Sequence, residues 1–230
     1  MKSNFPLRRE GRYSINGKSY ISVTTILQAI DKPALRNWLA KEAARLVISD
    51  PQAYDTAEKA VSALSARKDS AADRGTSAHQ IAANFCNGTL TDSNKQSPYY
   101  ESIAAFFEMA QPRSEMVEQT VYNETHGYAG TVDLVAILPD EKRWLIDWKT
   151  SKAVYPEYAL QVAAYAAAEF TWTPYLSPLA GGQSAPFPKV DKTAVVLLRD
   201  NGEFDFKAVT GDLDAFLAAK RVWEWLHNEG

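Results

Sequence analysis

From residue 115 to residue 149, apolar and polar residues alternate over three successive stretches joined by short turn segments. The stretches are 115–124, 129–138 and 143–149, and His126-Gly127-Tyr128 lies between the first two. Alternation with a period of two is typical of β-strands. Three neighbouring strands with short connections pair as a meander, so this part of the chain is predicted to form a sheet.

Helical and further strand patterns flank this meander. Residues 12–23 alternate around Asn16-Gly17, a dipeptide that favours a tight hairpin turn. We expect Ser22 or Thr24 to cap a helix and Pro33 to open another. The other expected elements are helices near 51–66, 70–86, 97–110, 156–170 and 212–227, and strands near 193–199 and 203–209. Residues 171–191, with four prolines and Gly181-Gly182, are interpreted as a loop that is either functional or disordered.

This order predicts an α/β fold with a small mixed β-sheet flanked by helices and a helical N-terminal region. A chain of 230 residues with 46% hydrophobic residues can bury one core, so we expect a single domain over 1–230. Within it, 1–110 is mainly helical and 111–230 holds the sheet. Cys86 is the one cysteine, which favours a reducing compartment. No stretch has the length of a signal peptide or a membrane span, so a cytoplasmic protein without a membrane partner is expected.

The charge is unevenly distributed along the chain. Residues 1–80 hold 13 Lys and Arg against 8 Asp and Glu, whereas residues 81–230 hold 12 against 20. A basic segment joined to an acidic one suits a protein that holds a polyanion with one part and metal cations with the other. Solvated helix faces produce the same counts, so charge alone leaves both interpretations open.

Two carboxylates stand out in the predicted sheet. In 143–149, strand alternation places Asp147 and Lys149 on one face and Trp144, Ile146 and Trp148 on the other. An Asp-x-Lys triplet by itself also fits a structural ion pair. Asp133 lies in the preceding, otherwise apolar strand, where a charged residue needs a partner. We therefore predict that Asp133 and Asp147 share a divalent cation.

Further polar residues complete a pattern. Gln161 and Tyr165 are four residues apart and project from one face of the 156–170 helix, and His79 follows Arg74-Gly75-Thr76. The segments Gly75-Thr76-x-x-His79, Gly130-x-x-Asp133, Asp147-x-Lys149 and Gln161-x-x-x-Tyr165 resemble, in the same order, the motifs of the PD-(D/E)XK nuclease superfamily, specifically its RecB-like branch of CRISPR-associated and phage exonucleases. The resemblance spans residues 75–165. Val132 replaces the proline of the superfamily's name, and the second acidic position is Asp147 instead of Glu.

The resemblance implies a restriction-endonuclease-like core and a metal-dependent deoxyribonuclease. It implies an exonuclease that acts on single-stranded or tailed DNA ends in recombination, repair or phage DNA processing. Asp133, Asp147, His79 and the backbone carbonyl of Trp148 would bind one or two Mg²⁺ or Mn²⁺ ions, Lys149 would orient or deprotonate the attacking water, and Gln161 and Tyr165 would hold the substrate strand. Carboxylate-bound Mg²⁺ suits phosphodiester hydrolysis, and imidazole suits Mn²⁺ better.

The single cysteine separates this chain from relatives that carry a cluster. Many CRISPR-associated relatives bind an iron–sulfur cluster through four cysteines, whereas this chain has only Cys86. We therefore expect no iron–sulfur cluster. In this respect the chain is similar to the cluster-free phage and mitochondrial-type exonucleases, and a phage-encoded protein of this kind would act in the host cytoplasm.

Glu118 is a conditional metal ligand. If 115–124 and 129–138 pair through a two-residue turn at His126-Gly127, Glu118 lies opposite Val135 on the face of Asp133, and a slip of one residue turns it away. The basic residues expected to contact DNA phosphates are Arg74, Lys41, Arg45 and Lys152. Trp172, Tyr175 and Phe187 either stack on unpaired bases or pack within the protein.

Structural roles remain open for several of these residues. His79 also fits a helix-surface or core histidine, and Gln161 and Tyr165 also fit helix packing. Two other functions compete with the exonuclease: an endonuclease of the restriction or junction-resolving kind, and a non-catalytic protein that binds DNA ends. The combination of Asp133, Asp147 and Lys149 argues against binding alone, because binding needs no buried carboxylate pair.

Overall fold

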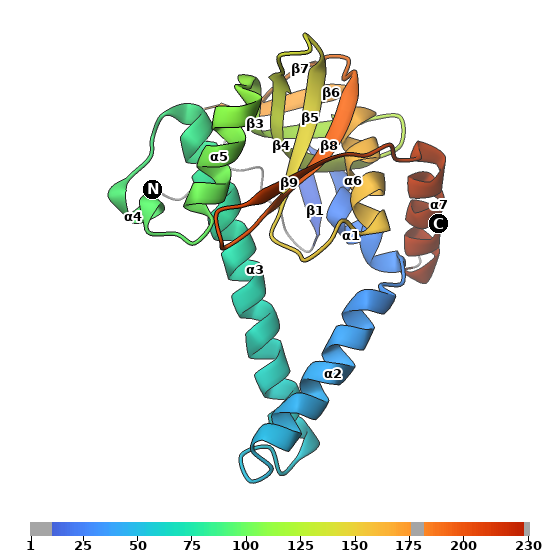
Figure 1. Ribbon diagram of the computed structural model, residues 1–230. Helices are drawn as coiled ribbons and strands as arrows, with labels where there is room; N and C mark the ends of the chain where they lie inside the picture. The colour runs from blue at the N-terminus through green and yellow to red at the C-terminus, as the bar shows by residue number, and fades with distance from the viewer. Residues whose placement is uncertain (1–10, 176–181, 228–230) are drawn as a thin grey trace. The chain divides into compact units, whose positions relative to one another are not determined.

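The computed structural model describes residues 11–175 and 182–227, and their fold is α/β, with a mixed, mostly antiparallel sheet flanked by helices (Figure 1). The chain divides into two compact units. The larger contains the residues up to Ala29 and those from Ala78 onward, and the smaller is Ile30–Ser77. Residue 110, where the mainly helical part was expected to end, lies within the larger unit.

The larger unit is built on a nine-stranded sheet. Seven of its strands follow the order β7-β6-β3-β4-β5-β8-β9. The other two, β1 and β2, form a hairpin, and β2 also pairs with β4. The strands are β1 (Arg12–Ile15), β2 (Lys18–Ser22), β3 (Arg113–Asn123), β4 (Tyr128–Ile137), β5 (Arg143–Lys149), β6 (Phe170–Pro174), β7 (Gly182–Pro186), β8 (Lys192–Leu198) and β9 (Phe204–Ala208). The pairs β2–β4 and β5–β8 are parallel and the others antiparallel. The sheet is mixed, as predicted, but it is not small.

The local strand patterns predict their partners correctly. β3, β4 and β5 form the expected antiparallel meander, and β8 and β9 form the expected hairpin. The first hairpin also forms, because Asn16 and Gly17 take φ values of 49° and 78° at its turn. A two-residue turn of this type needs positive φ at both central residues, which Asn and Gly tolerate.

The interpretation of 171–191 as a loop is wrong. Its two ends form β6, which pairs with β3, and β7, which pairs with β6 at the edge of the sheet. The prolines do not prevent these strands, because Pro174 and Pro186 are the last residues of β6 and β7 and an edge strand tolerates a missing N–H. The part of the loop at 176–181 lies outside the described residues.

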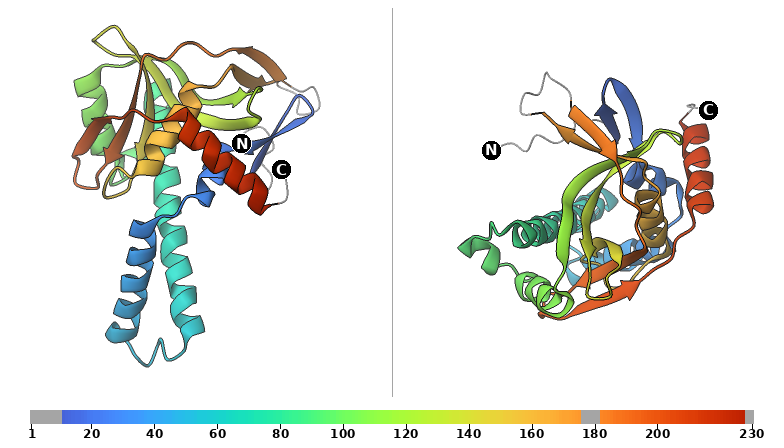
Figure 2. Two further views of the ribbon diagram at one scale, coloured as in Figure 1. Left: turned by 90° about the vertical axis from the view of Figure 1, so that its right-hand side faces the viewer. Right: turned by 90° about the horizontal axis from the view of Figure 1, so that it is seen from above.

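Helices cover both faces of the sheet (Figures 1 and 2). On one face, α5 (Tyr100–Ala110) packs Phe106 edge-to-face on Trp148 of β5, with ring centroids 5.0 Å apart. On the other, α6 (Pro156–Ala166) and α7 (Leu213–Leu226) pack together, and Tyr128 of β4 donates a hydrogen bond to Ala164 O. The remaining helices of this unit are α1 (Val23–Ile26), a 3₁₀ turn (Leu27–Ala29), α4 (Asp92–Lys95) and the end of α3.

Helix boundaries differ from the sequence predictions in several places. The two helices expected near 51–66 and 70–86 are one helix, α3 (Ala57–Asn87), because the polar residues between them are exposed and do not interrupt it. α6 ends at Ala166 instead of about 170, where the chain enters β6. Ser22, not Thr24, is the N-cap of α1, and its side chain accepts a hydrogen bond from Thr25 N at 3.1 Å.

The smaller unit pairs α2 (Pro33–Ser49), which opens at Pro33 as expected, with the first part of α3. Leu46 and Ala60 are its buried apolar residues, and Glu42 and Arg67 form an ion pair between the two helices. Residues 30–77 hold 8 Lys and Arg against 7 Asp and Glu, so the basic excess of 1–80 lies almost wholly in residues 1–29. Among the described residues, no helix combines the length and apolarity that crossing a membrane requires.

Candidate metal centre

A polar cleft of about 340 Å³ opens in the larger unit where β4 and β5 separate. Its walls come from segments far apart in the sequence. They are contributed by the β1–β2 hairpin, α1, α3, β3, β4, β5 and α6. The lining residues are Tyr13, Ser22, Val23, Thr24, His79, Glu118, Gly130, Thr131, Asp133, Lys149, Gln161 and Tyr165. Most of the residues predicted for the metal site therefore share one cleft.

Asp133 lies where the backbone pairing of β4 with β5 ends. The last paired residues are Leu134 and Ile146, and beyond them the Asp133 carboxylate accepts a hydrogen bond from Trp148 N at 2.8 Å. The side chain thus replaces the missing backbone acceptor. Because the N–H and C=O of a strand residue point to the same side, the Trp148 carbonyl lies on the β4 side of β5, as its predicted role requires. The second carboxylate oxygen of Asp133 pairs with His79 Nδ1 at 3.2 Å.

Glu118 reaches the same place by a different register from the one expected. The turn between β3 and β4 has four residues, so Glu118 lies between the pairs Val117–Leu134 and Gln119–Val132, opposite Asp133 instead of Val135. The shift is two residues, which preserves the face. Glu118 has a φ of 48°, a strained value for this residue in a strand. Ligand atoms of His79, Glu118 and Asp133 lie within 4.8 Å of one another, so the structure brings all three together.

Asp147 and Lys149 lie on the α6 face of β5, as the alternation predicts. Trp144, Ile146 and Trp148 belong to the core on the opposite face. Asp147 is 1% exposed and forms an ion pair with Lys149. The Lys149 ammonium also lies over the ring of Tyr158, 5.1 Å from its centroid, so its position is set by a carboxylate and an aromatic ring.

Gln161 and Tyr165 project from α6 toward the same carboxylates. Gln161 Nε2 donates to Asp147 Oδ1 at 2.9 Å and contacts Tyr165 Oη at 3.2 Å. Tyr165 packs against Gly130, where an added Cβ would lie 2.3 Å from a ring carbon. Both residues are buried, Gln161 also holds Asp147, and Tyr165 accepts a hydrogen bond from Gln161. Gly130 is required for the close approach of the tyrosine ring.

The ionisation of the cleft reflects its burial and its crowded charges. Burial disfavours the His79 imidazolium, but the Asp133 carboxylate outweighs it and raises the pKa of His79 to about 9. Burial, with the charge of Asp133, raises the pKa of Glu118 to about 7. Burial also raises the pKa of Asp147, despite the opposing charge of Lys149. Three carboxyl groups, those of Glu118, Asp133 and Asp147, thus interact with two cationic groups, those of His79 and Lys149, and the pKa is raised for Glu118 and Asp147.

The donor set fits a divalent cation. Within the described part of the chain, two buried carboxylate oxygens, Glu118 Oε1 and Asp147 Oδ2, accept no hydrogen bond, although Asp147 Oδ2 faces Lys149 in the ion pair. Buried polar atoms without hydrogen bonds are costly unless something else satisfies them. One imidazole and several carboxylates are ligands that Mn²⁺ and Mg²⁺ accept. The competing interpretation is a pair of structural ion pairs, His79–Asp133 and Asp147–Lys149, which leaves Glu118 Oε1 unexplained.

Hydroxyl groups line the cleft beside the carboxylates, and sequence reasoning did not assign them to the site. Tyr13 Oη lies 3.1 Å from Thr131 Oγ1, and Ser22 Oγ lies 3.2 Å from Thr24 Oγ1. The cap pattern of Ser22 and Thr24 was visible in the sequence, but only pairing of β2 with β4 brings it to the metal residues. Hydroxyls are common partners of phosphate oxygens.

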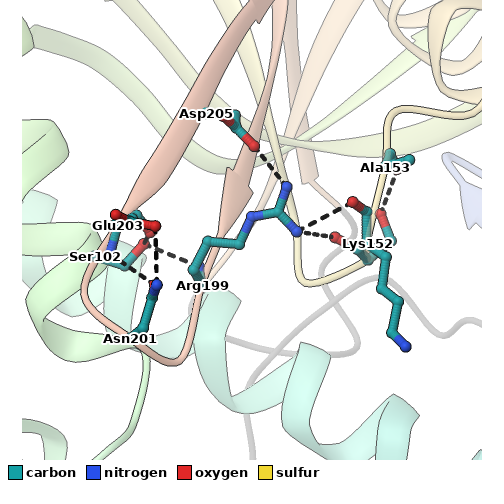
Figure 3. A network of polar contacts seen from close by, with 8 residues as sticks. Ser102, Lys152, Ala153, Arg199, Asn201, Glu203 and Asp205 are labelled. Carbon is teal, nitrogen blue, oxygen red and sulfur yellow. Dashed lines mark hydrogen bonds and ion pairs between the residues drawn. The ribbon is translucent and has the colours of Figure 1, made fainter.

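The predicted phosphate-binding lysines and arginines are not among the residues that line the cleft. Lys41, Arg45 and Arg74 belong to the smaller unit, where Arg45 pairs with Glu42 at 3.3 Å and Arg74 donates to Ser70 at 2.9 Å. Lys152 lies in the larger unit, three residues after Lys149, and its side chain extends away from Arg199 (Figure 3).

The aromatic residues of 171–191 have different environments. Trp172 is 6% exposed, belongs to the apolar cluster of Tyr13, Tyr20 and Tyr122, and donates to Asn16. Packing is therefore its role in this structure. Tyr175 is 49% exposed, and Phe187 is half-buried.

Comparison with known proteins does not assign a family to this chain: no family model matches it, and no curated protein does.

Proposed function

We propose that this chain is a metal-dependent deoxyribonuclease of the PD-(D/E)XK superfamily, similar to its RecB-like branch. One observation carries the proposal: His79 from α3, Glu118 from β3, Asp133 from β4 and Lys149 from β5 line one cleft, with Asp147 ion-paired to Lys149. The β3–β4–β5 meander, the helix α6 and the parallel strand β8 support the proposal, because the resemblance implies a core of this kind.

Each residue has a role that follows from its contacts. Asp133, Asp147, His79 and Glu118 would hold Mg²⁺ or Mn²⁺, together with the Trp148 carbonyl. A bound cation neutralises phosphate charge, lowers the pKa of a coordinated water and stabilises the leaving oxygen. Lys149, held by Asp147 and Tyr158, would orient the attacking water or accept its proton. Gln161 fixes the Asp147 carboxylate, and the hydroxyls of Tyr13, Ser22, Thr24 and Thr131 would contact DNA phosphates.

We expect the protein to degrade linear single-stranded or tailed DNA from an end and to spare closed circles. The preference for ends rests on the resemblance, whereas the chemistry rests on the cleft. End-labelled linear and circular single-stranded DNA are incubated with Mg²⁺ or Mn²⁺, with EDTA as the metal-free control. Discrete fragments from the circle would favour the endonuclease. Binding to DNA ends without cleavage in either metal would favour the end-binding protein.

His79→Ala is expected to weaken Mn²⁺ binding by about 10²-fold, because the cleft loses its one nitrogen ligand. Isothermal titration calorimetry measures this affinity directly. His126→Ala is the matched control, since His126 is a turn residue outside the cleft. Added Mn²⁺ should restore part of the cleavage activity of His79→Ala by mass action. Unchanged affinity would leave His79 as the ion-pair partner of Asp133 alone.

A further inference from the structure

Arg199 joins three parts of the larger unit just beyond the end of β8 (Figure 3). Its Nη1 donates to the carbonyl oxygens of Ser151 and Lys152 at 3.2 and 3.1 Å. Its Nη2 donates to Asp205 of β9 at 2.5 Å. Its side chain is 28% exposed, so these contacts are only partly screened by water. A guanidinium has the fixed fork geometry that such a bridge needs.

The segment that Arg199 holds connects two parts of the candidate metal centre. Residues 150–155 run from Lys149, the last residue of β5, to α6, which carries Tyr158 and Gln161. Lys149 and the Tyr158 ring that covers its ammonium therefore lie at the two ends of this one connection. A displacement of the connection would change the position of Lys149 relative to Tyr158.

Arg199 is itself fixed from the opposite face of the sheet. Its backbone N–H donates to Ser102 Oγ of α5 at 3.2 Å, and Ser102 Oγ donates to Glu203 O at 2.7 Å. Ser102 is fully buried. Figure 3 shows these contacts on one side of the arginine and Lys152 on the other. The bridge thus transmits the position of α5 and β9 to the segment that follows Lys149.

We propose that Arg199 is a positioning residue that holds the 150–155 connection so that Lys149 is aligned for the reaction; this inference rests on the proposed nuclease function. Lys149 must meet the attacking water in a narrow range of positions, since a displacement of about 1 Å can cost about 10²-fold in rate. Arg199 makes no contact with the carboxylates of the cleft in the described structure, so it acts through the backbone of Ser151 and Lys152.

The test compares Arg199→Met with Arg143→Met. Arg143 is 29% exposed and likewise bridges a carboxylate, Glu115, and a backbone carbonyl, Lys189 O, but it lies at the other end of β5. Both changes remove one positive charge and one bridge. The measurements are kcat and KM on linear single-stranded DNA, Mn²⁺ affinity, melting temperature, and amide hydrogen exchange of residues 150–155 in the metal-free protein.

Arg199→Met is expected to lower kcat by about tenfold or more while KM and Mn²⁺ affinity stay within about twofold of the wild type. Amide hydrogen exchange of residues 150–155 should be faster in this variant than in the wild type. In Arg143→Met it should match the wild type. Arg199→Lys should recover part of kcat, because it keeps a charged donor for one carbonyl.

Three results would overturn the inference: unchanged exchange in 150–155, increased exchange with unchanged kcat, or equal losses of kcat in both variants. A wild-type protein that cleaves no DNA with either metal contradicts the proposed function instead. In that case the exchange comparison still decides whether Arg199 holds the connection.

Discussion

Asp133→Asn and Asp147→Asn are each expected to lower metal-dependent DNA cleavage by about 10³-fold or more, since each removes a charged ligand whose cation supplies several kcal/mol of transition-state stabilisation. The fold should persist, because the amide that replaces each carboxylate keeps one acceptor oxygen. At position 133 this oxygen can still accept from Trp148 N, and at position 147 it can still accept from Gln161. Cleavage assays under single-turnover conditions measure the loss, and far-UV circular dichroism checks the fold.

Asp140→Asn is the matched control for these variants. Asp140 also pairs with a lysine, Lys192, at 2.9 Å, but it lies outside the cleft. Its replacement should leave cleavage at the wild-type rate. Wild-type cleavage by Asp133→Asn or by Asp147→Asn would remove the replaced carboxylate from the proposed mechanism.

Lys149→Met is expected to lower the single-turnover cleavage rate by about 10²- to 10⁴-fold, the usual contribution of a general acid or base, while Mn²⁺ still binds. The methionine keeps the apolar stem beside Tyr158 but has no ammonium to act on water. Binding of Mn²⁺ should also stabilise this variant, because the cation supplies the positive charge that Asp147 loses. Calorimetry and thermal unfolding with and without Mn²⁺ measure these effects.

Lys192→Met is the control for Lys149→Met, because each lysine pairs with an aspartate and lies against an aromatic ring, although Lys192 is the more exposed. Lys192 pairs with Asp140, and its ammonium lies 4.9 Å from the centroid of the Trp144 ring. Its replacement should leave cleavage unchanged. If Lys149→Met also cleaves DNA at the wild-type rate, the Asp147–Lys149 pair is only a structural ion pair.

The burial of these charges favours the proposed metal centre over an ordinary cluster of ion pairs. Taking charges out of water is costly, and a buried ion pair often adds little stability compared with apolar residues. Asp133 and Asp147 are buried, Glu118 has a φ of 48°, and burial with the charge of Asp133 raises the pKa of Glu118 to about 7. The proposed cation would account for this arrangement, because its charge would offset that of the buried carboxylates.

Local sequence pattern was sufficient to predict the central strands and the faces of their side chains. The period of two in 143–149 correctly separated Asp147 and Lys149 from Trp148, because adjacent strand residues point to opposite faces. The spacing of four correctly placed Gln161 and Tyr165 together on α6. Asn16-Gly17 predicted its hairpin because few residues tolerate positive φ at both turn positions.

Contacts between distant segments could be decided only by the tertiary structure. The strand β6 forms because β3 offers it a partner, and β7 then pairs with β6; no local pattern of 171–191 reveals these pairings. The register that puts Glu118 opposite Asp133 depends on a four-residue turn, and residues of the β1–β2 hairpin reach the cleft only because β2 pairs with β4. Periodicity reports which face a residue occupies, whereas its neighbours depend on pairing across many residues of chain. The sequence by itself therefore determined which residues are candidates for the proposed chemistry, and the tertiary structure decided that His79, Glu118, Asp133 and Lys149 line one cleft.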